Sequence, residues 1–173
     1  MKDIQFANGK AIVKGKLGVF MHSLATESDR GVVIIVATVI EEILRKTMRE
    51  FLIQESESDR LLRRNFQGLD SLSRASLCLG LISRRELKAI DAIRKIRNEF
   101  AHQFLSNKFD GTLQSHRHQV FAATQEYLPG RHAGPRDTAR HTFDELAMAL
   151  VFQLWSRAEE VANSETFAEL RED

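Results

Sequence analysis

The chain contains very little proline and cysteine, and each scarcity excludes a class of structure. Its two prolines, Pro129 and Pro135, lie close together in a chain of 173 residues, so the rest is free of helix breakers and a helical fold is favoured. The single cysteine, Cys78, excludes a disulfide within the chain and fits a reducing compartment. Because Cys78 stands among leucines, we expect a buried, unreactive thiol.

An excess of charge of one sign is also missing. Lys and Arg number 25 against 24 Asp and Glu, which gives a net charge of +1 and no global attraction to nucleic acid or to an anionic membrane. The longest apolar run, Val32 to Ile40 interrupted only by Thr38, is too short to cross a bilayer and indicates a helix buried on every side. The residues from Met1 to Phe6 lack the hydrophobic region of a secretory signal. We therefore expect a cytoplasmic protein.

Several catalytic and cofactor motifs are absent as well. The sequence holds no glycine-rich phosphate loop and no serine-nucleophile motif. Four histidines invite a metal interpretation, but their spacing matches no standard zinc pattern and no cysteine pair accompanies them; they are His116, His118, His132 and His141. The sequence therefore predicts neither a cofactor nor a metal site.

Helix signals are what the chain does contain. Ser28 is a good N-cap for a long helix from Asp29 to Gln54, which we expect at the centre of the fold. A capping box at Ser83–Glu86 opens a helix that should reach Leu105, and a second box at Thr142–Glu145 opens one that should reach Ala162. Shorter helices are expected at Arg60–Phe66, from Asp70 or Ser71 to Gly80, and at Ser115–Tyr127.

These signals predict an all-α, single-domain helical bundle of about six to eight helices. The bundle domain should span residues 28–163. An N-terminal arm with a short helix would precede it in residues 1–27, and an acidic C-terminal tail would follow it in residues 164–173.

The expected helix from Ser83 to Leu105 carries an unusual cation. At about 100° per residue, Arg97 falls in the middle of an apolar arc, between Ile90 and Phe104. A guanidinium among apolar neighbours is costly unless a carboxylate such as Glu42, solvent or another subunit compensates it. The polar residues Asp91, Asn98 and His102 gather at the edge of the same arc, and Asn98 can contact His102 one turn later.

The string from Arg97 to His102 resembles the R-N-x-x-x-H signature of HEPN domains, which are small helical bundles. The resemblance implies that Arg97, Asn98 and His102 could act on RNA in a nuclease member, often across a dimer. A histidine can serve as acid or base for attack by a 2′-hydroxyl, and an arginine can stabilise the charge on phosphorus. Two other interpretations remain open: a structural role, and binding of a partner or ligand.

Three segments in order together resemble the mannitol operon repressor family. They are Ser28-Asp29-Arg30-Gly31, the stretch Gly68–Ile82 with its Ser73-Arg74 pair and Leu79-Gly80-Leu81-Ile82 ending, and Ile93–His102. The resemblance implies an all-α fold and repression of genes for sugar-alcohol uptake. It also implies action through another regulator, because no DNA-binding module is recognisable. The residues that we expect to bind a partner or ligand are Arg30, Arg74, Asp91, Arg97, Asn98 and His102.

Two basic clusters are candidates for contacts to nucleic acid, with a solvated surface as the alternative. Their members are Arg60, Arg63, Arg64, Arg84, Arg85 and Lys88. The segment from Leu72 past Ser83 has the outline of a helix-turn-helix, but its second helix is too long and too buried for a recognition helix.

The sequence as a whole favours a bacterial transcriptional repressor that works through protein–protein contacts, without a DNA-binding module of its own and as a homodimer. The alternative is a HEPN-type RNA-binding protein, metal-independent ribonuclease or toxin component that uses Arg97 and His102. Neither interpretation requires a cofactor, and whether the chain is an enzyme stays open.

Overall fold

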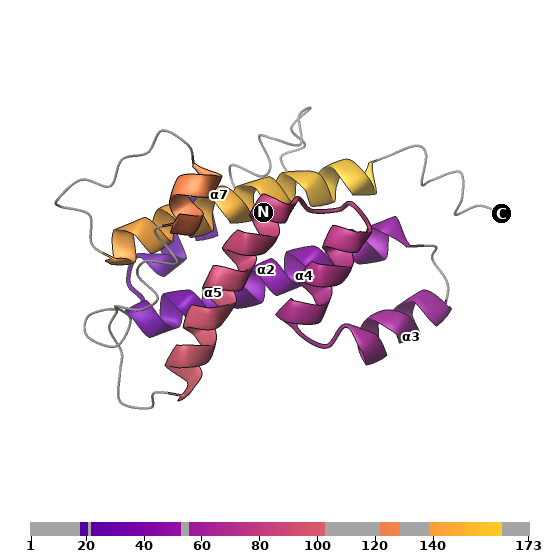
Figure 1. The fold of residues 1–173 in the computed structure, drawn as a ribbon, viewed down its shortest axis with the longest axis horizontal. Helices are drawn as coiled ribbons and strands as arrows, with labels where there is room; N and C mark the ends of the chain where they lie inside the picture. The colour runs from indigo at the N-terminus through magenta and orange to yellow at the C-terminus, as the bar shows by residue number, and fades with distance from the viewer. Residues whose placement is uncertain (1–17, 21, 53–55, 103–121, 129–138, 164–173) are drawn as a thin grey trace, which may run out of the picture.

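The computed structural model is all-α. It describes residues 18–20, 22–52, 56–102, 122–128 and 139–163, and this part of the chain holds helices and no strand (Figure 1). Shorter helical pieces at residues 18–24, with position 21 not described, and 122–127 bring the described helices to seven, within the expected range. The five helices with defined bounds are α2 (Asp29–Phe51), α3 (Ser56–Asn65), α4 (Leu69–Cys78), α5 (Arg84–His102) and α7 (Ala139–Ala162).

Helix α2 is the central helix of the bundle, as expected. The Ser28 hydroxyl accepts a hydrogen bond from the Gly31 N–H at 3.1 Å, which makes Ser28 the N-cap. Helices α3, α4, α5 and α7 all pack against α2, which buries one stripe of its surface. The helix ends at Phe51 because Leu52 is extended, so it is shorter than predicted. The stripe consists of Val32, Val33, Val36, Ala37, Ile40, Ile43, Leu44, Thr47 and Met48.

The opposite face of α2 contradicts the expectation of a helix buried on every side. In the described part of the chain Ile34 is 39% exposed, and Ile35 and Val39 are only half-buried. A helix that is apolar all round is normally covered all round. The packing within one chain therefore leaves part of the apolar surface of α2 uncovered by the described residues.

Helix α7 runs parallel to α2 and is fastened to it at both ends (Figure 1). At the N-terminal ends, Arg140 pairs with Asp29 at 2.8 Å, and at the C-terminal ends Lys46 pairs with Glu159 at 2.9 Å. The predicted start of this helix at Thr142 is wrong, because α7 begins at Ala139 and Thr142 is buried within it. Arg140 also donates to the carbonyls of residues 24 and 27, so tertiary contacts hold an earlier first turn.

Helices α4 and α5 are joined by a tight connection that the sequence had indicated. Gly80 takes φ +73°, and the Leu81 N–H donates to the carbonyl of Ser76 at 2.8 Å, which are the features of a Schellman ending. The capping box then opens α5: the Ser83 N–H donates to Glu86 at 2.6 Å and the Glu86 N–H donates to Ser83 at 3.2 Å. Helix α4 begins at Leu69, slightly before the predicted start.

One core assignment is wrong. Cys78 is exposed, although its neighbours in sequence are leucines. It is the last residue of α4, and the adjacent Leu79 is itself 40% exposed. Cys78 and Leu79 therefore lie at the surface where the helix ends, although Leu81 shortly after them is buried.

None of the helices in the described ranges is long and apolar enough to cross a membrane. The first 17 residues of the expected N-terminal arm, the residues after His102 that include Phe104, and the acidic tail lie outside the described residues, whereas residues 18–20 and 22–24 are helical within the segment where a short helix was expected. So do the first seven residues of the helix expected at 115–127, whereas residues 122–127 are helical as predicted.

Candidate functional site

A polar cavity of about 320 Å³ lies where α2, α4 and α5 meet. It contains two of the residues selected from the sequence, Arg97 and Asn98, which both come from α5. Its remaining lining is mixed in charge and polarity, and it consists of Ala37, Thr38, Glu41, Gln67, Gly68, Leu69, Asp70 and Arg94.

Arg97 faces this cavity and solvent, and the prediction that it is surrounded by apolar side chains is wrong. Its side chain is exposed, and its Nη1 donates to the Asn98 Oδ1 at 3.2 Å. Among the described residues it forms no ion pair, so Glu42 does not compensate it. The angle of Arg97 around α5 was predicted correctly, but at this turn the helix faces the polar cavity instead of another apolar surface.

Next to the cavity, four charged side chains form an ionic cluster that joins α4 to α5. Arg74 pairs with Asp70 at 3.2 Å and with Asp91 at 4.0 Å. Arg94 pairs with Asp70 at 3.4 Å and with Asp91 at 3.3 Å. The hydrogen bond from Arg74 and the charge of Arg94 hold the pKa of Asp70 below its ordinary value. The Arg74 side chain therefore contacts a carboxylate on its own helix and one on α5.

The ionic cluster is neutral, with two arginines and two carboxylates. Because Arg74 and Asp91 contact each other and their neighbours, their charges are largely compensated within the chain. Their expected part in binding a partner stays a prediction.

His102 does not join Arg97 at the cavity. It is the exposed last residue of α5, five positions after Arg97, which places the two side chains about 140° apart around the helix axis. Asn98 and His102 are one turn apart on the same side, as predicted. Arg30, in the first turn of α2, lines neither the polar cavity nor the groove described below.

All six residues proposed for nucleic-acid contact are exposed, but they lie in two separate places. One cluster, Arg60, Arg63 and Arg64, lies on α3 shortly before α4 begins. The other cluster lies at the start of α5, directly after α4 ends, so the whole of α4 lies between the two clusters along the chain (Figure 1). Lys88 of the second cluster pairs with Glu126 at 2.8 Å. The charge of Lys88 is partly compensated within the chain, and the expected contacts of the two clusters with nucleic acid stay a prediction.

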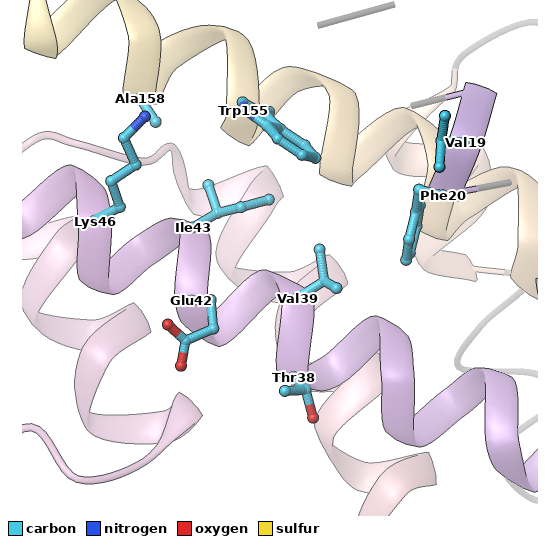
Figure 2. A pocket seen from close by; sticks show the side chains of 9 residues that line it. All are labelled: Val19, Phe20, Thr38, Val39, Glu42, Ile43, Lys46, Trp155 and Ala158. Carbon is cyan, nitrogen blue, oxygen red and sulfur yellow. The ribbon is translucent and has the colours of Figure 1, made fainter. Parts of the chain in front are cut away.

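A second hollow, which the sequence did not reveal, is an apolar groove of about 780 Å³ between α2 and α7. In Figure 2, Val39 and Ile43 of α2 point towards α7, and the Trp155 ring of α7 points back between the two helices. Val19 and Phe20 close one end of the groove, and Lys46 with Ala158 closes the other (Figure 2). Thr38 and Glu42 complete its lining.

The charges at the edge of this groove are not balanced. Lys46 is occupied by Glu159 at 2.9 Å, whereas the exposed carboxylate of Glu42 has no partner within the described part of the chain. Figure 2 shows Glu42 on the edge of α2 away from α7. The result is an apolar floor with one uncompensated negative charge along its α2 edge.

A sequence signal for the groove did exist. Ile34, Thr38, Glu42 and Lys46 follow one another at intervals of four residues, which places them in one row along α2. All four are exposed. The apolar residues around Val32–Ile40 led to the expectation of a helix buried on every side, because the sequence does not show on which side the bundle ends.

The described residues contain no group of three or more histidine, cysteine, aspartate or glutamate side chains that could hold a metal ion. Of the four histidines considered from the sequence, only His141 is described; it lies 3.6 Å from Glu145 on the next turn of α7. Compared with known proteins, the chain matches no family model, no curated protein and no solved structure.

Proposed function

We propose that this protein is a regulator that acts by binding another protein, in the manner that its resemblance to the mannitol operon repressor family implies. The observation that carries the proposal is the apolar groove between α2 and α7. It adjoins the uncovered apolar face of α2, where Ile34 is 39% exposed. Apolar surface of this kind, next to charged side chains, is typical of sites that bind protein partners.

The polar cavity supports binding more than catalysis. General acid–base catalysis at neutral pH needs a group that can gain and lose a proton there. The two carboxylates of the cavity, Asp70 and Glu41, are both paired with arginines, and the pKa of Asp70 is lowered, so it stays ionised at neutral pH. Among the described residues, no histidine lines the cavity.

The proposal is tested by genetics and reconstitution together. Deleting the gene should raise the transcripts of the genes that the protein represses, with sugar-alcohol uptake genes as the first set to measure. A DNA-binding regulator recovered with the tagged protein should form a complex with it again from purified components. Val19→Arg should weaken this complex, because Val19 is 74% exposed and lines the groove, while Gln153→Arg, on the exposed surface of α7 outside the groove, should not. Unchanged transcripts in the deletion strain would contradict the proposal.

The second candidate, a HEPN-type ribonuclease, is favoured by one observation. Arg97 is exposed and forms no ion pair among the described residues, so its guanidinium is available for a phosphate. Because Arg97 and His102 diverge around α5, RNA cleavage would require His102 of a second copy. Cleavage of RNA by the purified protein that is lost in both Arg97→Ala and His102→Ala would favour this candidate. No cleavage by the wild type would exclude it.

A further inference from the structure

We infer that the groove between α2 and α7 binds an amphipathic helix of a partner protein, with an apolar face directed into the groove and a lysine or arginine directed at Glu42. This inference rests on the proposed function and specifies the chemistry of its partner. Three properties of the groove support it: its shape, the surface that it would complete and its charge.

The shape of the groove fits a convex apolar object of limited length. Thr38 and Lys46 mark its extent along α2 and are eight residues apart, which corresponds to about 12 Å or two helical turns. Two turns present three apolar anchors at positions i, i+3 or i+4, and i+7. The side chains that those anchors would meet are Val39, Ile43 and Trp155.

The groove also accounts for the sequence of α2. This helix is apolar around its whole circumference between Val32 and Ile40, a pattern that requires cover on all sides. Among the described residues, the helices that pack against α2 cover one side of it, and Ile34 and Val39 remain partly exposed. Val39 lines the groove, so a helix docked between α2 and α7 would cover this part of the apolar surface, whereas Ile34 lies outside the groove.

The charges at the edge of the groove indicate which charge the partner helix should carry. The exposed Glu42 carboxylate is unpaired in the described part of the chain, while Lys46, one turn later, is already occupied by Glu159. A cationic side chain on the incoming helix would therefore complete a pair, whereas an acidic one would meet Glu42 with repulsion.

A second copy of this chain fits the groove less well. Two copies related by a twofold axis would present the same surface to each other, and two concave grooves facing each other leave their volume unfilled. Both copies would also bring the uncompensated Glu42 to the contact. A convex helix with a positive charge meets both requirements.

The experiment uses the full chain and its only tryptophan, Trp155, as the reporter of occupancy. The probe is a synthetic helical peptide of about 15 residues, free of tryptophan, with leucines along one face and lysines on the other. Two further peptides serve as controls: one with the same residues in scrambled order, and one with glutamate in place of lysine. The lysine peptide should shift the Trp155 emission to shorter wavelength with saturation, and the other two should bind about tenfold more weakly or not at all.

Charge reversal at Glu42 is the decisive variant. Glu42→Lys should invert the preference, so that the glutamate peptide binds more tightly than the lysine peptide. Glu160→Lys makes the same change on an exposed part of α7 that does not line the groove, and it should leave the preference as in the wild type. Urea unfolding of both variants verifies that the fold is retained, and Glu42→Gln, which should abolish the preference without inverting it, provides a milder substitution.

Several outcomes would overturn the inference. The first is equal affinity of the wild type for the lysine and glutamate peptides, and the second is an equal effect of Glu42→Lys and Glu160→Lys. If acrylamide does not quench the Trp155 emission of the protein without peptide, the groove is already filled. Self-association that Glu42→Lys abolishes would assign the groove to a second copy. Because these measurements use purified protein, they can fail while the transcript test of the regulatory role succeeds, or the reverse.

Discussion

Arg157 of α7 and Glu86 of α5 form an ion pair of 2.7 Å in which the Glu86 side chain is only 3% exposed. The same Arg157 nitrogen donates to the Leu81 carbonyl at 3.0 Å. Glu86 also accepts the Ser83 N–H of its own capping box, so this carboxylate both opens α5 and attaches it to α7. Nearby, burial and the Glu86 charge raise the pKa of Tyr127.

Removing one member of this pair should destabilise the fold strongly. Arg157→Met would leave the buried Glu86 charge without its cation, so we expect the free energy of unfolding to fall by about 3 kcal/mol. Urea unfolding followed by circular dichroism measures the change. The double variant with Glu86→Gln should recover part of the loss, because the unpaired charge is then gone. A loss of less than about 0.5 kcal/mol in the single variant would show that solvent compensates Glu86.

The exposed Arg97 provides the contrasting case. Its one side-chain partner within the described part of the chain is the adjacent Asn98, so Arg97→Ala should change the free energy of unfolding by no more than about 0.5 kcal/mol. The same urea titration measures the free energy of unfolding of Arg97→Ala, so its loss can be compared directly with that of Arg157→Met. A loss as large as that of Arg157→Met would mean that Arg97 holds the bundle together, and it would remove the reason to treat Arg97 as available for a ligand.

Gly80 should tolerate no side chain without cost. Its φ of +73° lies in the left-handed region, and nothing lies within 4 Å of the position of an added Cβ, so the strain would come from the backbone alone. Gly80→Ala should lower the free energy of unfolding by about 1 kcal/mol, and Gly80→Asn by less, since asparagine enters this region more readily. Equal losses of stability in the two variants, measured by thermal unfolding, would indicate a steric clash of the new side chain instead of backbone strain.

The ionic cluster predicts a dependence of stability on acid pH. The pKa of Asp70 is lowered in the folded protein by the hydrogen bond from Arg74 and the charge of Arg94. The unfolded chain therefore binds more protons near pH 3.8, and the stabilisation from Asp70 is complete above that pH and is lost as the pH falls through the folded value. Asp70→Asn should thus be less stable than the wild type at pH 7, with a gap that narrows at pH 3. The urea midpoints of both proteins at pH 7 and pH 3 measure this difference in stability. A difference that is larger at pH 3 than at pH 7 would contradict the predicted direction of the pH dependence.

Cys78 should react in the native state. It is exposed at the end of α4, so a disulfide reagent such as dithionitrobenzoate should modify one thiol per chain without denaturant. Cys78→Ser should change stability by less than about 0.5 kcal/mol, because no buried contact is removed. A thiol that reacts only after unfolding would restore the buried assignment made from its leucine neighbours.

Local signals determined most of the helices. The Ser28 cap, the Gly80 ending and the Ser83–Glu86 box each depend on atoms within a few residues of one another, and each is present in the structure. The box at Thr142 failed because the first turn of α7 is held by Arg140, whose partners Asp29 and the Leu24 carbonyl are more than a hundred residues away in sequence. A capping pattern contains no information about such distant partners.

The sequence by itself determined that the chain is all-helical, which residues begin and end several helices, and at what angle Arg97 leaves its own helix. Only the tertiary structure decided what each helix face meets: a polar cavity for Arg97, a half-buried arginine for Glu86, and an open groove for part of the apolar surface of α2 that local pattern assigned to the core. The physical reason is that periodicity specifies which side of a helix prefers to leave water, whereas the packing of distant segments decides whether another surface is there to receive it.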